Sequence, residues 1–396
     1  MKKNVLVASI ILFTFLCAGV ALSQELTDEE QLGKLIFFDK KLSVRNNQSC
    51  ATCHDPDVGF TGPVPGINKH GAVYPGSVKK LFGNRKPPTA AYAGDSPPLY
   101  YDGDDEVWVG GMFWDGRAAG WTLGDPLAEQ AQGPFLNPVE QALPEASYVV
   151  DRICQSKYSD LFISVCGDVC SNVPEAYECI ARSIAAYERS PEVNPFSSKY
   201  DAFVVGNAAL TEQEEAGRKL FFGEGPKDAM CAACHLDGVF TDFTYDNLGV
   251  PRNPQNPFYS SDFNPDGLNW VDAGIGGFLQ GAGYIPEVYE IEWGKQKVPT
   301  LRNVDKRPGP GFVKAYGHNG YFKSLKGIVN FYNTRDVKPA CPDPFTTEKD
   351  ALKQGCWPEP EVAANVNQDE LGNLGLTPEE EDAIVAFLQT LSDGFR

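Results

Sequence analysis

Two short runs of this sequence carry reactive groups with the same spacing. Residues 50–54 read CATCH, and residues 231–235 read CAACH. In each run, two thiols separated by two residues can add across the vinyl groups of a haem, and the adjacent imidazole can then bind the iron as proximal ligand. We therefore predict two covalently attached c-type haems. The attachment thiols are Cys50, Cys53, Cys231 and Cys234, and the proximal ligands are His54 and His235.

Other uses of paired cysteines fit these runs less well. One zinc ion held by both Cys-x-x-Cys knuckles is the main alternative, because such knuckles are a common zinc site. A histidine directly after both motifs favours haem attachment instead. Thioredoxin-like redox chemistry is less expected still, since no β-α-β pattern surrounds either motif.

Both runs end a longer repeat. Residues 26–38 read LTDEEQLGKLIFF, residues 210–222 read LTEQEEAGRKLFF, and the identical positions keep a constant offset of 184. In each copy a threonine stands three residues before a glutamate, which is the spacing of a capping box at the start of a helix. Two copies separated by long unique segments indicate a duplicated domain, not a solenoid.

Further helices are predicted from the spacing of apolar residues. Helical spacing covers residues 145–166 and 176–190, and a terminal helix starts after Thr377 and ends before Gly394. Residues 251–286 are rich in Gly, Pro and Asn, which is typical of a long irregular insert. Few segments of the sequence show a pattern that predicts a β-strand.

A polar stretch that contains prolines, residues 190–201, separates the two copies and is the expected domain boundary. The N-terminal domain is then predicted to span residues 24–195 and the C-terminal domain residues 205–396.

Composition indicates an exported globular protein. The 396 residues are 42% hydrophobic and 22% charged, which suffices for two ordinary domains. Two lysines, an apolar run and small residues after it predict that residues 1–23 are an export signal. An uncleaved anchor is the alternative, because the run is long for a cleaved signal. We expect an exported protein without membrane contact beyond the signal.

The formal net charge of −19 excludes some partners. Such a surface repels nucleic-acid phosphates and anionic membranes, so a nucleic-acid role is not expected. It would attract a cationic redox protein.

Six cysteines lie outside the signal and the two haem motifs, which permits three disulfides in an oxidising compartment. Cys341 and Cys356 enclose a short loop and are expected to pair. The remaining four allow three connectivities that the sequence does not separate: Cys154, Cys166, Cys170 and Cys179.

The supply of sixth iron ligands decides between an electron carrier and an enzyme. If His70 and His318 each capped one iron, the protein would be a bis-His electron carrier. The methionines after the signal are Met112 and Met230, and Met230 abuts a haem-attachment cysteine, so it cannot reach the far face of that haem.

Together with the paired haem motifs, four further stretches resemble the bacterial di-haem cytochrome c peroxidase family, which includes MauG. The resemblance covers essentially the whole chain after the signal. It implies an all-α fold of two cytochrome c-like domains with long irregular loops, each domain carrying one covalent haem c. The stretches are FWDGR at 113–117, QAQGPFLNPVE at 130–140, KVPTLRNV at 297–304 and HNGYFKSLKGIVNFY at 318–332.

The resemblance implies that the N-terminal haem meets peroxide and the C-terminal haem relays electrons. Glu140 resembles the distal acid, Gln130 a hydrogen-bonding neighbour and Pro134 a shaper of the pocket. The chemistry agrees, because cleavage of an O–O bond needs a proton moved to the leaving oxygen, and a positioned carboxyl group can move it. Trp114 resembles the aromatic residue that links the two haems.

The second haem site departs from the common peroxidase pattern. Those enzymes place a methionine ligand fourteen residues after His318, whereas this chain has Tyr332 there, as MauG does. A phenolate ligand favours ferric iron, unlike a thioether. His70 follows His54 at the spacing of a displaceable distal ligand, but the loop after it is longer than in those enzymes. His318 fits a supporting role at a haem edge better than ligation.

A second departure concerns the calcium ion that the family holds between its domains. Lys86 stands where the pattern has an asparagine ligand, and an ammonium group cannot coordinate calcium. This puts calcium binding in doubt.

Three functions follow from these expectations. The first is a periplasmic peroxidase that reduces hydrogen peroxide with electrons from a small cytochrome c or cupredoxin. The second is a MauG-like oxidase that oxidises residues of a protein substrate through a high-valent state shared by both haems. The third is the bis-His electron carrier. The sequence leaves a homodimer open.

Overall fold

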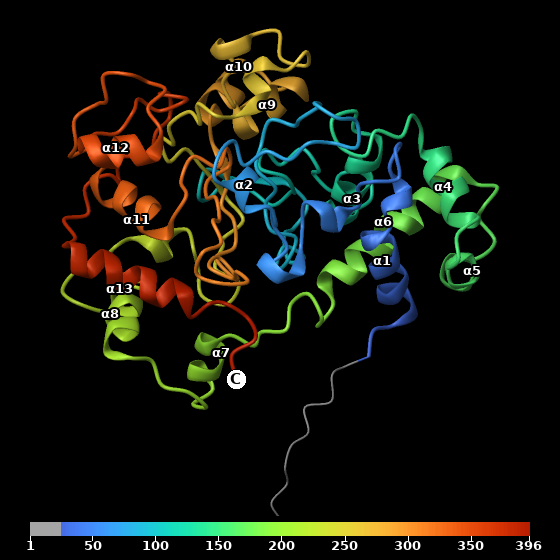
Figure 1. The fold of residues 1–396 in the computed structure, drawn as a ribbon, viewed down its shortest axis with the longest axis horizontal. Coiled ribbons are helices and arrows are strands. Elements are labelled where there is room, and N and C mark those ends of the chain that lie inside the picture. The colour runs from blue at the N-terminus through green and yellow to red at the C-terminus, as the bar shows by residue number, and fades with distance from the viewer. Residues whose placement is uncertain (1–24) are drawn as a thin grey trace, which may run out of the picture.

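The computed structural model describes residues 25–396 and is rich in helix with little sheet (Figure 1). The expected export signal, residues 1–23, lies outside the described residues. Within residues 25–396, none of the helices has the length and apolar character needed to span a bilayer.

The helices and strands are distributed over both halves of the chain. The helices are α1 (Asp28–Phe38), α2 (Pro65–Asn68), α3 (Pro126–Leu136), α4 (Ala146–Cys154), α5 (Ser159–Cys166), α6 (Val173–Arg189), α7 (Lys199–Val204), α8 (Glu212–Phe221), α9 (Gly274–Gly281), α10 (Pro286–Tyr289), α11 (Leu325–Thr334), α12 (Glu348–Gln354) and α13 (Pro378–Gln389). Strands β1 (Tyr100–Asp102) and β2 (Val107–Val109) form one antiparallel hairpin, and β3 (Tyr245–Asp246) pairs with β4 (Gln296–Lys297).

The first hydrophobic core lies in the N-terminal half, where α1 packs across α6 and α3 packs beside them. Phe37 of α1 and Tyr187 of α6 are fully buried, and their ring centroids lie 5.4 Å apart in an edge-to-face arrangement. Each such ring buries a large apolar area, so this crossing is a main stabilising contact of the half.

The second core repeats this arrangement in the C-terminal half. Here α8 packs across α13, and α11 packs against α13. Phe221 of α8 and Phe387 of α13 are both buried, with ring centroids 5.2 Å apart. Phe221 occupies the repeat position of Phe37, so the two copies use the same residue for the same helix crossing.

The repeated glycines explain how closely these helices approach. A Cβ atom at Gly33 would overlap the carbonyl oxygen of Ser183 in α6, and one at Gly217 would overlap the carbonyl oxygen of Ala383 in α13. The repeat therefore preserves a backbone-to-backbone contact that only glycine permits. Both predicted capping boxes are also present, at Thr27 and Thr211.

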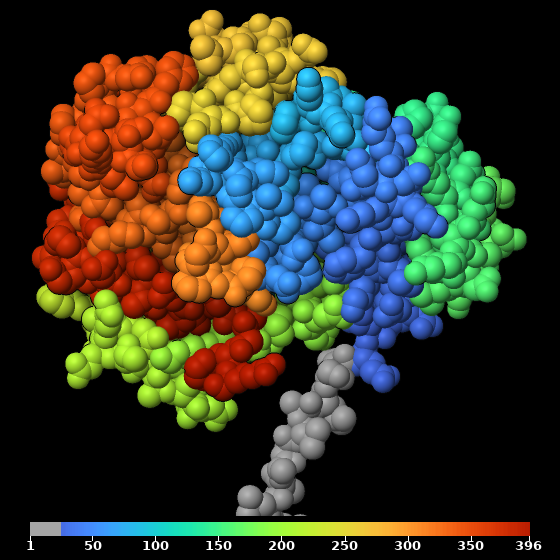
Figure 2. Space-filling model, in the orientation of Figure 1, coloured from blue at the N-terminus to red at the C-terminus, as the bar shows by residue number. Residues whose placement is uncertain are grey.

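The two halves are joined by a network of buried contacts. Figure 2 shows the blue surface of the first half lying directly against the orange surface of the second. Arg85 binds Asp272 through two hydrogen bonds of 2.6 Å and Asp115 through a third of 2.6 Å. The Nζ atom of Lys314 donates to the carbonyl of Val58 at 2.9 Å, across the two halves. A small third core, formed around Trp108, combines residues of both halves.

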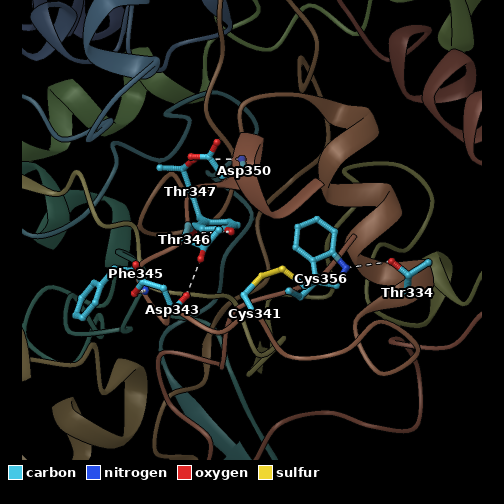
Figure 3. The surroundings of a disulfide bond; sticks show 10 residues. Thr334, Cys341, Asp343, Phe345, Thr346, Thr347, Asp350 and Cys356 are labelled. Atoms are coloured by element: carbon cyan, nitrogen blue, oxygen red, sulfur yellow. Dashed lines mark hydrogen bonds between the residues drawn. A yellow bond between two sulfur atoms is a disulfide. The ribbon is translucent and has the colours of Figure 1, made fainter. Parts of the chain in front are cut away.

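Three disulfides hold the loops. Cys341 and Cys356 pair as predicted (Figure 3). The connectivity that the sequence left open is resolved in favour of two overlapping loops, Cys154–Cys170 and Cys166–Cys179, which tie α4, α5 and α6 together.

Some element boundaries differ from the predictions. Residues 145–166 form two helices, α4 and α5, interrupted by a turn at 155–158. The terminal helix ends at Gln389, several residues before Gly394. The insert at 251–286 contains α9 despite its glycines, because Ile275 and Leu279 are buried in the third core, and burial outweighs the low helix propensity of Gly.

The helix crossing predicts the effect of one added methyl group. Gly217→Ala should push α8 away from α13 and lower the free energy of unfolding by ~1–3 kcal/mol, the usual cost of overpacking. Gly281→Ala is the matched control, because it also lies in a helix and a Cβ there meets open space. Thermal unfolding of both variants checks this. Equal melting temperatures for Gly217→Ala and the natural chain would contradict the close crossing.

Candidate active site

The first haem motif forms one wall of a cavity in the N-terminal half. Cys50, Cys53 and His54 all line this cavity. The Nδ1 atom of His54 lies 3.1 Å from the carbonyl oxygen of Phe60. A carbonyl only accepts, so Nδ1 carries the proton and Nε2 keeps the lone pair that a metal needs. Burial lowers the pKa of His54 to about 4, which keeps the imidazole neutral.

The second motif repeats this geometry in a separate cavity of the C-terminal half. Cys231, Cys234 and His235 line that cavity. The Nδ1 atom of His235 lies 2.9 Å from the carbonyl oxygen of Phe240, and burial lowers the pKa of this imidazole. Hydrogen bonding of the outer ring nitrogen to a carbonyl is the usual way to orient a metal-binding histidine.

The donor set of each cavity fits a c-type haem. Among residues 25–396, Cys50, Cys53, Cys231 and Cys234 are the cysteines that no disulfide uses. Burial raises the pKa of Cys53 and of Cys231 to about 12, so these thiols are protonated at neutral pH. The two cysteine pairs line different cavities, which contradicts the alternative of one zinc ion shared between them.

Helix α3 and the turn after it supply a cluster of polar groups to the N-terminal cavity. Gln130 and Pro134 are four residues apart and therefore share one face of α3, and Glu140 follows in the turn; all three line the cavity with His54. The structure thus brings together the three residues that the QAQGPFLNPVE stretch singled out.

Glu140 is a half-buried carboxyl group in a low-dielectric cavity. Burial raises its pKa above the usual value, while Arg117 and a hydrogen bond with Asn137 act in the opposite direction. Its backbone is fixed on both sides, because its carbonyl accepts from the Ser77 amide at 2.7 Å and its amide donates to Asn137 at 3.0 Å. The group is therefore held in place and is more easily protonated than a surface carboxylate.

Three charged residues of this cavity, Arg85, Arg117 and Glu188, were not singled out from the sequence. Arg117, which ends the FWDGR stretch, stacks on Phe113 with its guanidinium carbon 3.7 Å from the ring centroid, and it binds Asp115 at 2.8 Å. Glu188 of α6 is buried in the opposite wall, and burial raises its pKa to about 8. Helical spacing predicted α6, but no local motif marks Glu188 as a cavity residue.

Trp114 lies between the two cavities and lines both. Its indole Nε1 donates to the carbonyl of Lys86 at 2.9 Å, and its ring centroid lies 6.4 Å from that of His318. The loop that carries it is closed by a bridge between Met112 and Ala118. The side chain predicted to link the haems is therefore placed between their candidate sites.

Lys86 also lines both cavities. Its Nζ donates to the carbonyl of Pro87 at 3.0 Å and to Oγ1 of Thr61 at 3.3 Å, and burial lowers its pKa to about 8. An ammonium group thus occupies the place where the family pattern has a calcium-binding asparagine, and we do not carry the calcium ion over to this chain.

Helix α11 brings Tyr332 into the C-terminal cavity together with His235. Burial, with the neighbouring Cys234, raises the pKa of Tyr332 well above its usual value, so a phenolate here needs a cation to stabilise it. A hydrogen bond connects the end of α11 to the loop closed by the Cys341–Cys356 disulfide. Trp357, next to Cys356, donates it from Nε1 to Oγ1 of Thr334 at 3.0 Å (Figure 3).

The two remaining histidines have different surroundings. His318 is buried and lines the C-terminal cavity, with Nε2 3.4 Å from a carboxylate oxygen of Glu361. This agrees with a supporting position near Trp114. His70 is exposed after α2, its Nδ1 lies 2.7 Å from the Gly66 carbonyl, and it lines neither cavity. The structure therefore does not bring His70 to the first iron site, which removes support for a bis-His carrier.

One group of potential metal ligands, Cys234, Asp246 and Glu370, lies within 4.8 Å in the C-terminal cavity. Because Cys234 belongs to the haem motif, we assign this group to the haem site and not to a separate metal ion.

Comparison with known proteins agrees with this geometry. The sequence profile of the family described as "Di-haem cytochrome c peroxidase" matches residues 27–209. Methylamine utilization protein MauG of Paracoccus denitrificans is 37% identical over 379 residues, covering 91% of this chain and 88% of that protein. Cytochrome c551 peroxidase of Nitrosomonas europaea is 29% identical over 314 residues, covering 78% and 74%.

A solved structure gives the same result. The diheme peroxidase BthA of Burkholderia thailandensis superposes with a TM-score of 0.73 at 29% identity, covering 92% of this chain and 86% of that one. The chain therefore belongs to the di-haem cytochrome c peroxidase family that includes MauG, and it is an oxidoreductase of that family.

The donor sets predict how much haem each variant retains. Replacing Cys231 and Cys234 together with alanine should lower the mass of the protein by one haem, because the thioether bonds of the second site can no longer form. The matched pair, Cys50→Ala with Cys53→Ala, should lose the other haem by the same mass. Mass spectrometry of the denatured proteins measures this. Natural protein that carries zinc and no covalent haem would contradict the assignment.

Proposed function

We propose that this protein is a periplasmic peroxidase that reduces hydrogen peroxide to water with electrons from a small redox protein. One observation carries the proposal: Glu140, Gln130 and Pro134 face the His54 cavity, and Trp114 connects that cavity to a second one built around His235. This arrangement supports a proton donor and a peroxide site in the first cavity and an electron path between the two cavities.

A haem held by Cys50, Cys53 and His54 would supply an iron that binds peroxide and exchanges electrons with it. The side chains of the protein would hold and transfer the protons that the reaction needs. Reduction of one peroxide consumes two electrons and two protons and yields two waters. Glu140, with its raised pKa, can hold a proton inside the cavity and deliver it to the leaving oxygen, and Gln130 can orient the peroxide by hydrogen bonding.

Pro134 contributes through shape. It lies inside α3, where it has no N–H to donate to the carbonyl of Gln130, so the helix cannot complete its regular bonding at that point. Its ring lines the cavity together with His54, where it would restrict the space to small ligands such as peroxide.

Electrons would reach the first site through the protein between the cavities. Trp114 offers a π-system there, with its indole N–H fixed by the Lys86 carbonyl and the loop anchored by Arg85. Because both its indole N–H and its loop are held, the Trp114 side chain moves little when an electron passes through it. This property suits an electron relay.

Glu140→Gln tests the proton-transfer role. We expect the turnover of hydrogen peroxide to fall by about 10²–10⁴-fold, the usual contribution of a general acid, because glutamine keeps the shape but cannot release a proton. Glu145→Gln is the control, since Glu145 is an exposed glutamate a few residues along the same chain segment. Steady-state assays with a small-molecule reductant measure both. Unchanged turnover in Glu140→Gln would exclude this mechanism.

A second function, a MauG-like oxidase that acts on a partner protein, is favoured by Tyr332. This phenol lies in the His235 cavity at the position where the common peroxidase pattern has methionine, and the 37% identical relative is a MauG. A phenolate favours oxidised iron and would disfavour the easy uptake of electrons from a donor.

Tyr332→Met discriminates between the two functions. If the oxidase function holds, this variant should lose the long-lived absorbance change that peroxide produces in the natural protein, and it should gain turnover with reduced cytochrome c. Tyr332→Phe separates loss of the phenol oxygen from the introduction of sulfur. Fast turnover with reduced cytochrome c by the natural protein, and no long-lived absorbance change, would support the peroxidase alone.

A further inference from the structure

The hairpin β1–β2 and the turn between α9 and α10 together expose an aromatic surface far from both haem motifs in sequence. Tyr101 is 46% exposed, Tyr284 is 36% exposed and Ile285 is 61% exposed. The rings of Tyr101 and Tyr284 lie against Trp108, with centroid distances of 5.6 Å and 5.5 Å. We call the exposed residues Tyr101, Tyr284 and Ile285 the hairpin surface, and Trp108 lies buried beneath it. Helices α9 and α10 form the lobe at the top of Figure 1.

Carboxylates surround the hairpin surface. The tip of the hairpin carries Asp104, Asp105 and Glu106, all exposed, and α10 carries the exposed Glu287. Residues 97–109 and 274–292 contain no Lys, Arg or His. An apolar centre with a rim of one charge sign is the usual anatomy of an interface that attracts an oppositely charged partner. A second copy of this chain would bring the same negative rim and be repelled.

Packed aromatic side chains lead inward from this surface. Trp108 is buried and shares the third core with Tyr245, and the two chain segments are tied by a hydrogen bond of 3.0 Å from the Gly110 amide to the Phe243 carbonyl. The Tyr245 hydroxyl donates to the Gly110 carbonyl at 2.6 Å.

Tyr245 in turn contacts the loop that carries Trp114. Its hydroxyl lies against Gly116, so closely that a Cβ atom there would overlap it. The Nζ atom of Lys297 lies 5.3 Å from the centroid of the Tyr245 ring, and the Lys297 amide donates to the Trp114 carbonyl at 2.8 Å. Trp108 and Tyr245 thus belong to one buried core that extends from beneath the hairpin surface to the loop that carries Trp114.

From this placement we propose that the hairpin surface is the docking site for a small, positively charged one-electron carrier protein, and that Trp108 and Tyr245 carry its electrons toward Trp114. The proposal rests on the peroxidase function. Each docking event oxidises one reduced carrier by one electron. Two such events, with two protons from water, supply what one hydrogen peroxide needs to become two waters.

The first test measures docking by charge reversal. Asp104→Lys with Asp105→Lys should raise the KM for a reduced, cationic cytochrome c at least tenfold at low ionic strength and flatten its salt dependence. Asp151→Lys with Asp168→Lys, two exposed carboxylates near α4 and α5, makes the same change of net charge elsewhere and should leave that KM nearly unaltered. Titration calorimetry with oxidised cytochrome c measures the affinity without turnover.

The second test measures the inward connection. Trp108→Leu should lower kcat with cytochrome c about tenfold and leave the calorimetric affinity and the turnover with hydroquinone unchanged, because hydroquinone is small enough to donate elsewhere. Trp108→Phe, which restores an aromatic ring, should recover most of the rate. Equal losses with both donors would mean that Trp108 only supports the fold and would overturn the relay.

The remaining outcomes separate this proposal from the proposed function. If both charge-reversed proteins lose cytochrome c affinity equally, net charge and not this surface attracts the donor, and the docking site is excluded. If the natural protein dimerises in sedimentation and charge reversal abolishes the dimer, the surface binds a second copy and the proposal fails. If the natural protein turns over no peroxide with hydroquinone, the peroxidase function itself fails, whatever the calorimetry shows.

Discussion

The paired contact of Arg85 with Asp115 and Asp272 fixes the centre of the molecule. Two carboxylates from different halves share one guanidinium group, and Asp272 is almost fully buried. Although burial alone would raise it, the attraction of Arg85 holds the pKa of Asp272 well below its usual range. Removing the arginine would leave Asp272 as an unpaired buried charge, a costly state, whereas Asp115 would keep its contact with Arg117. The loop with Trp114 keeps its place between the cavities because Asp115, its neighbour, is held there.

Around this centre, the duplicated helices form two similar helix crossings, but the residues that line the two cavities differ. The crossing of α1 with α6 and that of α8 with α13 use a glycine contact and an aromatic pair at equivalent positions. In both halves a carbonyl orients the histidine of the haem motif. The other residues that line the two cavities differ: α3 supplies the amide of Gln130 and the turn after it the carboxyl group of Glu140, whereas α11 supplies the phenol of Tyr332.

The features that the sequence predicted are those formed by residues close together in the chain. The haem motifs, the capping boxes and the Cys341–Cys356 pair each depend on residues close in the chain, and the structure confirms the last two. The connectivity of Cys154 with Cys170 required the packing of three helices. Likewise, Arg117 and Glu188 face a cavity only because distant segments meet, and the surface position of His70 depends on how its long loop folds. Spacing alone carries no such information.

The cysteines impose an order on the maturation of this protein. Six cysteines of residues 25–396 form three disulfides, whereas the four cysteines of the two haem motifs must be reduced if haem is to add to them. Thiolates exchange readily with nearby disulfides, so an early Cys50–Cys53 bond would block the first haem site. In the folded protein burial raises the pKa of the four motif thiols and slows this exchange. The unfolded chain lacks that protection, so covalent attachment of haem would require the motif cysteines to be kept reduced while the other six cysteines are oxidised.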